Sequence, residues 1–230
     1  MTDLRIIQQK LSEIKRRGYV RTKRRGPTGV GYTLESLLQI QENNISSPDF
    51  GTIELKSHRH GHSALLSLFT FNRKVWVMPP LVAIRKYGSP DEDGRLGLYY
   101  TMGLRPNSAG LFLFVGEEIV AVRSIDGNEI AKWRLSDLAL RFAEKVANVL
   151  LASAAVELRN NVEYFWFDRA RILTGGTSVS ILRNQFATEK LLLDLRLHDA
   201  GTRARNHGTG FRVSLSNLQN IYSQIVELEI

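Results

Sequence analysis

Short apolar segments separated by turn residues follow one another through the middle of the chain, and they restrict its fold more than any other feature. Four such segments lie at residues 96–104, 110–115, 118–123 and 130–135, with turns such as GEE and DGN between them. Segments of this length joined by tight turns predict an antiparallel meander. Helical periodicity at residues 3–17, before the meander, adds an amphipathic helix. The sequence therefore predicts a mixed α/β (α+β) fold with a mixed sheet flanked by helices.

The stretch PDFGTIELK, residues 48–56, gathers the candidate catalytic groups. A strand is predicted at residues 52–57, and the alternation of side chains would place Glu54 and Lys56 on one face, close to Asp49. Carboxylates hold hard divalent cations such as Mg²⁺, and a lysine beside them can face an attacking water. The alternative is an edge strand whose charged side chains are merely solvated while its apolar residues point into the core.

A glutamate upstream of this stretch is a candidate third carboxylate. Residues 33–42 are predicted to form a helix with Thr33 as its cap and leucines on its inner face. Glu35 faces away from most of that apolar stripe and could reach the strand with Glu54. The alternative is a solvent-exposed glutamate in the first turn, which the helix dipole favours.

The charge of the chain points to a polyanionic partner. The formal net charge is +8 and the isoelectric point is near 9.9. One basic cluster runs from Lys15 to Arg25 without an acidic residue, and a second contains Arg196, Arg203, Arg205 and Arg212. Each cluster alone is typical of a solvated surface. Two clusters flanking a candidate metal site favour nucleic acid instead.

Several classes of protein and site are excluded or disfavoured. The chain has no cysteine, which excludes disulfides and thiolate metal sites. The first residues are polar, without the apolar region of a signal peptide, and no apolar run approaches the roughly 20 residues of a membrane span. The protein is therefore expected in the cytoplasm.

Two further groups of side chains have alternative interpretations. His58, His60 and His62 alternate, so on a strand they share a face and could bind zinc or copper, although contact with phosphate or simple solvation is the alternative. The aromatic block at residues 164–167 could stack on bases, or it could belong to a packed core.

Taken together, four segments resemble the MvaI/BcnI family of restriction endonucleases, which are MutH-like members of the PD-(D/E)XK nuclease superfamily. They are KRRGPTGVGYTLESLL, QENN, PDFGTIELK and NHGTGFRV, at residues 23–38, 41–44, 48–56 and 206–213. The resemblance implies one nuclease domain over residues 1–230 with two lobes forming a DNA cleft. Its expected portions are a catalytic portion at 1–90, the meander and core at 91–160, and a DNA-recognition portion at 161–230.

The resemblance also implies the roles of the catalytic residues. Asp49 and Glu54 would bind Mg²⁺ together with the Leu55 carbonyl, Lys56 would position or deprotonate the water, and Glu35 would support the metal site. Mn²⁺ would substitute, and Ca²⁺ would support binding only. The implied reaction is hydrolysis of a DNA phosphodiester that leaves a 5′-phosphate.

The same resemblance implies which residues contact DNA, and it implies a target of the CC-N-GG type. Where relatives carry a histidine two residues before the matched His207, this chain has Arg205. Thr70 resembles the MvaI branch rather than the BcnI branch, which favours a central A or T, hence CCWGG over CCSGG. The residues expected at the DNA are Lys23, Arg24, Arg25, Thr70, Asp194, Arg196, Arg205, His207 and Arg212.

The resulting hypothesis is a type II restriction enzyme that acts on double-stranded DNA as a monomer and cuts one strand at a time. A DNA methyltransferase would be its genetic partner. The competing hypotheses are a MutH-like mismatch-repair nickase and a DNA-binding module that keeps the fold without cleavage. The presence of Glu35, Asp49, Glu54 and Lys56 favours a cutting enzyme.

Overall fold

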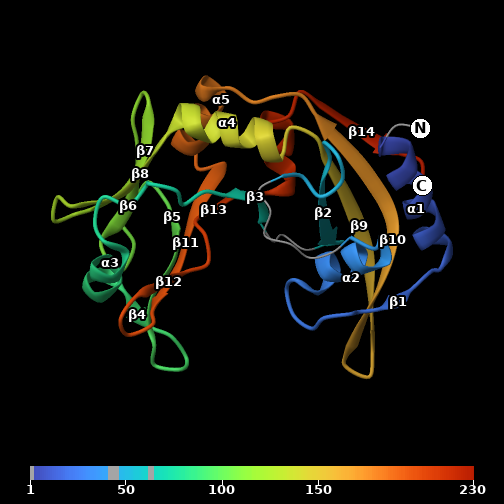
Figure 1. Ribbon diagram of the computed structural model, residues 1–230, viewed down its shortest axis with the longest axis horizontal. Helices are drawn as coiled ribbons and strands as arrows, with labels where there is room; N and C mark the ends of the chain where they lie inside the picture. The colour runs from blue at the N-terminus through green and yellow to red at the C-terminus, as the bar shows by residue number, and fades with distance from the viewer. Residues whose placement is uncertain (1–2, 41–46, 62–64) are drawn as a thin grey trace. The chain divides into compact units, whose positions relative to one another are not determined.

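The computed structural model describes residues 3–40, 47–61 and 65–230 (Figure 1). The helices are α1 (Asp3–Arg16), α2 (Gly29–Leu37), α3 (Pro80–Tyr87), α4 (Leu135–Lys145), α5 (Val179–Ala187) and the 3-10 helix η1 (Leu215–Asn220). The strands are β1 (Val20–Arg21), β2 (Glu54–Arg59), β3 (Leu66–Thr70), β4 (Ser89–Pro90), β5 (Leu96–Met102), β6 (Leu111–Val115), β7 (Ile119–Ser124), β8 (Glu129–Arg134), β9 (Val149–Arg159), β10 (Val162–Thr174), β11 (Leu191–Asp199), β12 (Ala204–Asn206), β13 (Gly210–Val213) and β14 (Gln224–Leu228). The predicted mixed α+β class is confirmed. Among the described helices, none has both the length and the apolar composition needed to cross a lipid bilayer.

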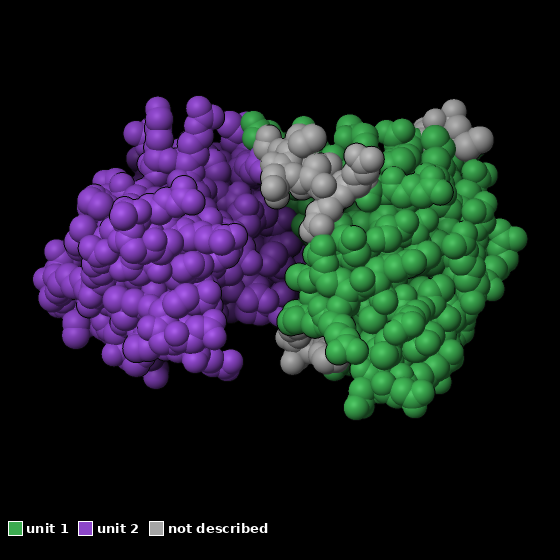
Figure 2. Space-filling model, turned by 60° about the horizontal axis from the view of Figure 1, so that its bottom comes forward, with its two compact units in different colours: residues 1–64, 143–176, 222–230 green, residues 65–142, 177–221 purple. Residues whose placement is uncertain are grey.

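The chain forms two compact units, and each is assembled from segments that are separated in sequence (Figure 2). Unit 1 contains Met1–Ala64, Ala143–Gly176 and Tyr222–Ile230, and unit 2 contains Leu65–Phe142 and Thr177–Ile221. These units differ from the three consecutive portions expected from the sequence. The segment QENN and His62 lie outside the described residues.

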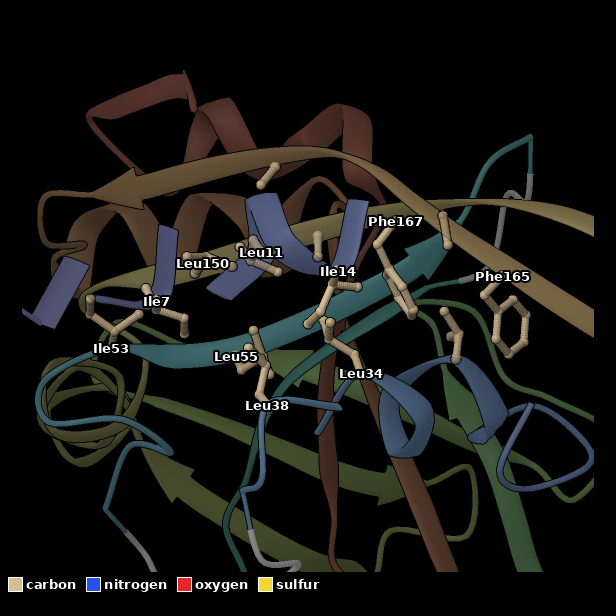
Figure 3. Close-up of a cluster of buried hydrophobic side chains, with 14 of the residues drawn as sticks. Ile7, Leu11, Ile14, Leu34, Leu38, Ile53, Leu55, Leu150, Phe165 and Phe167 are labelled. Carbon is tan, nitrogen blue, oxygen red and sulfur yellow. The ribbon is translucent and has the colours of Figure 1, made fainter. Parts of the chain in front are cut away.

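A five-stranded sheet is the framework of unit 1. Its order is β1-β10-β9-β2, and β14 also pairs with β10. Strands β2 and β9 run parallel, with Glu54 opposite Val149. Helices α1 and α2 contribute apolar side chains to a core that also contains Leu55 of β2 (Figure 3). Because successive side chains of a strand point to opposite faces, Glu54 and Lys56 face away from this core.

Helix α1 agrees with the helix predicted at residues 3–17. Its residues Ile7, Leu11 and Ile14 are buried, as their spacing indicated. Burial of each such side chain contributes about 1.5–3 kcal/mol relative to exposure. The helix is followed by Gly18, whose φ of 68° is a conformation that glycine adopts without steric cost.

Helix α2 begins at Gly29 instead of the predicted Thr33 and ends at Leu37. Thr33 is not a cap: it is buried within the helix, and its Oγ1 accepts a hydrogen bond from the backbone N–H of Lys23 at 2.9 Å. A side chain at position 29 would collide with the carbonyl oxygen of Arg24, so this glycine permits a close approach of two backbone segments. Gly29 and Gly31 therefore lie in this helix, whereas Gly26 precedes it.

Unit 2 contains two sheets, and their membership corrects the predicted four-segment meander. Strands β6, β7 and β8 form an antiparallel meander, as expected. Strand β5 instead belongs to a second sheet of order β3-β13-β11-β5-β4, in which β12 also pairs with β11. Turn residues specify which neighbours in sequence can pair, whereas the β5–β11 pairing depends on residues far along the chain. Between β3 and α3, Trp76 makes an isolated bridge with Ala131 of β8.

The aromatic block at residues 164–167 lies in β10, and packing in the core accounts for most of it. Phe165 and Phe167 are fully buried and lie in the core of unit 1 (Figure 3). On the other face of the strand, Trp166 Nε1 donates to the carbonyl of Lys15 at 3.0 Å. The interpretation as core is confirmed for Phe165 and Phe167.

Candidate active site

Strand β2 brings the first two candidate catalytic side chains together. Glu54 is only 3% exposed, and its Oε1 lies 2.7 Å from Nζ of Lys56. The position of both follows from the strand: Leu55 between them packs into the core of unit 1, which directs Glu54 and Lys56 to the opposite face. The pair predicted from the ELK spacing is therefore present.

Asp49 reaches the same place from the turn that precedes β2. The turn is closed by hydrogen bonds between Phe50 and Ile53, and Gly51 within it has a φ of 58°. Asp49 Oδ2 accepts a hydrogen bond from the backbone N–H of Leu55 at 3.0 Å. This bond fixes the carboxylate beside the start of β2 and leaves Oδ1 for another ligand.

Lys145, the last residue of α4, is a member of this site that the sequence analysis missed. Its Nζ lies 2.7 Å from Glu54 Oε2, 3.9 Å from Asp49 Oδ1 and 2.6 Å from the carbonyl oxygen of Ser47. A basic residue at the end of a helix that leads directly into β9, the parallel neighbour of β2, was the available signal. Contacts across some 90 residues of sequence leave no local pattern.

Tyr222 also lies near Glu54. Its hydroxyl donates to the carbonyl of Val146 at 2.9 Å. Burial, followed by the charge of Glu54, raises the pKa of Tyr222 well above its usual value. A neutral phenol therefore borders the carboxylates throughout the ordinary pH range.

The donor set fits a small divalent cation. Asp49 Oδ1 and Glu54 Oε2 are the carboxylate oxygens left over by the hydrogen bonds to Leu55 and Lys56, and Glu54 Oε2 is buried without a well-aligned hydrogen bond. One or two carboxylates are the usual protein ligands of Mg²⁺. Within residues 3–40, 47–61 and 65–230, no group of three or more His, Asp or Glu side chains is arranged to hold a metal. The Leu55 carbonyl stays a predicted third ligand.

Glu35 lies on α2, on the side of the helix that faces β2. A Cβ atom placed on Gly31 would lie 3.8 Å from Glu35 Oε1 and 3.7 Å from Ser57 Oγ, so these two side chains lie on the same side of α2. Ser57 directly follows Lys56, and β2 is at the edge of its sheet. The expected support of the metal site by Glu35 stays a prediction.

The two described histidines of this region, His58 of β2 and His60 just after its end, have separate partners. His58 Nε2 lies 2.7 Å from Ser153 Oγ and its Nδ1 lies 3.1 Å from the Arg59 carbonyl, while His60 Nε2 lies 3.1 Å from Asp168 Oδ1. Burial is the main reason that the pKa of His58 is below its usual value, which favours the neutral ring. This arrangement gives no support to the zinc or copper alternative for His58 and His60.

A second group of predicted residues meets in unit 2, on the hairpin that β11 forms with β12 and β13, both of which pair with β11. Arg196 Nε donates to the carbonyl of Gly208 at 3.0 Å, and the backbone N–H of His207 donates to the carbonyl of Arg196 at 2.8 Å. Thr70 of β3 is paired with Gly210 of β13. Arg196, His207 and Thr70 thus belong to one neighbourhood.

Arg205 and His207 are both exposed on this hairpin. Arg205 of β12 lies opposite His198 of β11. The His207 ring is 5.3 Å from the His198 ring, centre to centre, and His198 Nδ1 lies 2.9 Å from the Tyr99 hydroxyl. Partial desolvation, followed by the charges of His198, Arg205, Arg196 and Arg95, lowers the pKa of His207. The sequence analysis missed Tyr99 of β5 and His198 of β11. They reach His207 only through the folding of the sheet, with the His198 ring between the other two side chains.

Asp194 and Arg212 are engaged with other protein groups. Asp194 is 5% exposed: its Oδ1 accepts from Thr101 Oγ1 at 2.7 Å, and its Oδ2 forms a short ion pair with Arg212 Nη1. Arg212 Nη2 donates to the Leu65 carbonyl at 2.9 Å. Base contact by either residue stays a prediction, and it would require these bonds to be exchanged.

The basic loop of unit 1, residues 22–28 between β1 and α2, is attached to β2 through Arg59, another residue that the sequence analysis missed. Arg59 makes a two-bond ion pair with Glu163 and donates to the carbonyls of Gly26 and Pro27. Within the loop, Lys23 and Arg25 are exposed, while the Arg24 guanidinium stacks 3.8 Å above the centre of the Tyr32 ring. The strand with the carboxylates thus also holds the basic loop.

Comparison with known proteins agrees with the resemblance seen in the sequence. A family model described as the MvaI/BcnI restriction endonuclease family matches residues 8–222. A solved complex of the restriction endonuclease MvaI with its cognate DNA has 24% identity and a TM-score of 0.85, with all of both chains covered. A structure of MvaI in the absence of DNA has 23% identity and a TM-score of 0.55, covering all of this chain and 99% of that one. No curated protein sequence gives a match. Since the family model spans nearly the whole chain, the chain belongs to the MvaI/BcnI restriction endonuclease family and is a type II site-specific deoxyribonuclease.

Proposed function

We propose that this enzyme cleaves double-stranded DNA at a CC-N-GG-type site with Mg²⁺, using Asp49, Glu54 and Lys56. The observation that supports the proposal is the convergence of these side chains at the start of β2, with Asp49 Oδ1 and Glu54 Oε2 both facing the Lys145 ammonium. The net charge of +8 and the MvaI relative solved with cognate DNA support duplex DNA as the partner.

The proposed reaction is an in-line hydrolysis at phosphorus. The water oxygen attacks, the 3′ oxygen leaves and takes a proton, and the products carry a 5′-phosphate and a 3′-hydroxyl. A divalent cation held by Asp49 and Glu54 would neutralise charge on the phosphate and acidify the water. Lys56 donates hydrogen bonds to the water or to a phosphoryl oxygen, and Glu54 Oε1 at 2.7 Å keeps its ammonium in place. Mn²⁺ is proposed to replace Mg²⁺, and Ca²⁺ to support binding only.

The base-reading residues of the proposal are Arg196 and His207. Arg196 uses Nε for the Gly208 carbonyl, which orients the guanidinium for a bidentate contact with O6 and N7 of guanine. The low pKa of His207 favours a neutral ring, which offers both a donor and an acceptor. Thr70 beside the hairpin favours a central A or T.

Arg196→Ala is expected to reduce discrimination at one guanine by about 1–3 kcal/mol, because a bidentate arginine contact is lost. The measurement compares cleavage rates on the cognate site and on sites with single guanine replacements. Arg183→Ala, an exposed arginine on α5, is the matched control. An equal loss on every sequence would identify Arg196 as a phosphate contact instead.

Lys23→Ala combined with Arg25→Ala is expected to lower the salt dependence of DNA binding. Each lost phosphate contact should reduce the slope of log K against log salt concentration by about 0.9. Arg24 is left intact because its stacking on Tyr32 also holds the loop. Arg134→Ala, at an exposed arginine of β8, serves as the control, and an unchanged slope in the double variant would place the loop away from DNA.

Incubation of the purified protein with unmethylated plasmid and Mg²⁺ tests the proposal. We expect nicked circles before linear DNA, since a monomer cuts one strand at a time, and sequenced ends should share one CC-N-GG site. Methylation by the methyltransferase of the same system should prevent cutting. Salt-sensitive binding without any cutting would overturn the proposal.

A further inference from the structure

The Lys145 ammonium lies where the two carboxylates point. It is 2.7 Å from Glu54 Oε2 and 3.9 Å from Asp49 Oδ1, and a third oxygen, the carbonyl of Ser47, is 2.6 Å away. The other oxygen of each carboxylate is already used, by Lys56 and by the Leu55 N–H. Lys145 therefore contacts the oxygens that a cation would take.

We propose that Lys145 is a built-in competitor for the divalent cation: its ammonium neutralises Asp49 and Glu54 in the metal-free enzyme and must leave them before a metal can bind. This inference rests on the metal site of the proposed function. It assigns to Lys145 a positioning role that acts through the metal ligands.

Geometry and charge both prevent the Lys145 ammonium and a divalent metal ion from occupying the site at the same time. Mg²⁺ binds carboxylate oxygens at about 2.0–2.1 Å, and the two oxygens that it needs are those that face the Lys145 ammonium. The two carboxylates and the two lysines have no net charge together, so the site is balanced without a metal. A divalent cation added beside both lysines would leave an excess of positive charge at short range.

The second lysine of the site does not compete in the same way. Lys56 is bound to Glu54 Oε1 rather than to Oε2, and its side chain is 20% exposed. It can remain in place when a metal takes Oε2. Lys145, with a side chain 14% exposed, faces both carboxylates.

Competition of this kind weakens metal binding to the DNA-free enzyme. If the ammonium occupies the site about nine-tenths of the time, the apparent Kd of the metal is raised about tenfold. A DNA phosphate brings negative charge to the site and offsets the added cation, so metal and DNA are expected to strengthen each other's binding.

The test is a titration of the DNA-free full chain with Mn²⁺, in which isothermal titration calorimetry measures the apparent Kd. Lys145→Met keeps the length of the side chain and removes its charge, and it should lower the apparent Kd by at least about tenfold. Lys145→Arg keeps a cation and should bind Mn²⁺ as weakly as the wild type. Lys132→Met is the matched control, because Lys132 pairs with Glu129 in unit 2, and it should change nothing.

Glu54→Gln separates the possible failures. If Lys145→Met binds Mn²⁺ no better than the wild type while Glu54→Gln abolishes binding in both backgrounds, the inference is wrong and the metal site stands. Binding that is unaffected by Glu54→Gln would overturn the metal site and with it the proposed function.

A second measurement on the wild type avoids any folding defect of the variant. The ammonium of Lys145, held by three oxygens, should give an exchange-protected side-chain ¹⁵N signal, identified by its loss in Lys145→Arg. Saturating Mg²⁺ should remove the signal. Its persistence at saturation would overturn the competition.

Discussion

Asp49→Ala is expected to lower the rate of DNA cleavage at least about 1,000-fold, or about 4 kcal/mol in activation free energy, while DNA binding stays intact or tightens. The carboxylate is one of the two proposed metal ligands, and its position is fixed by the Leu55 N–H. Removing one acidic group from a site that meets phosphate also removes repulsion. Single-turnover cleavage and a binding titration in Ca²⁺ measure the two effects separately.

The control for this prediction is Asp137→Ala, at an exposed aspartate in the first turn of α4. It should cleave as the wild type does. Mg²⁺-dependent cutting by Asp49→Ala within about tenfold of the wild-type rate would count against the assigned site.

Arg212→Ala is expected to lower the free energy of unfolding of unit 2 by about 3 kcal/mol, the lower end of the range for breaking a buried ion pair. Asp194 is 5% exposed and would keep only its hydrogen bond from Thr101. Urea unfolding monitored by tryptophan fluorescence measures this loss of stability. The signal is suitable because the ring centres of Trp133 and Phe211, the residue before Arg212, are 5.9 Å apart.

Arg203→Ala, an exposed arginine of the same hairpin region, should stay within about 0.5 kcal/mol of the wild type. Combined with Asp194→Ala, the Arg212→Ala change should cost much less than the sum of the two single changes. Wild-type stability of Arg212→Ala together with a loss of DNA binding would show that this arginine serves the DNA and not the fold.

The parts of the fold that could be predicted are those specified by neighbouring residues. The apolar spacing in α1 and the tight turns that join β6, β7 and β8 each contain their own signal, and these elements were predicted within a few residues. The same holds for the candidate active site: Asp49, Glu54 and Lys56 are close enough in sequence that one turn and one strand bring them together.

What could not be predicted depends on distant residues. Lys145 meets Glu54, and Arg59 meets Glu163, across long stretches of chain that contain complete elements of unit 2. The pairing of β5 with β11 is of the same kind, and so is the burial of Thr33, which reflects a contact with the basic loop. The sequence shows that such side chains can form hydrogen bonds, but it does not show which residues are their partners.

The parallel pairing of β2 with β9 has a consequence for the order in which the enzyme is made. Strand β2 carries Glu54 and Lys56, yet the strand beside it begins only at Val149, after most of unit 2. Contacts between distant segments form late, because a long loop must close first. A nascent chain on the ribosome therefore presents these two proposed catalytic residues early but cannot assemble an active nuclease until the greater part of its message has been translated.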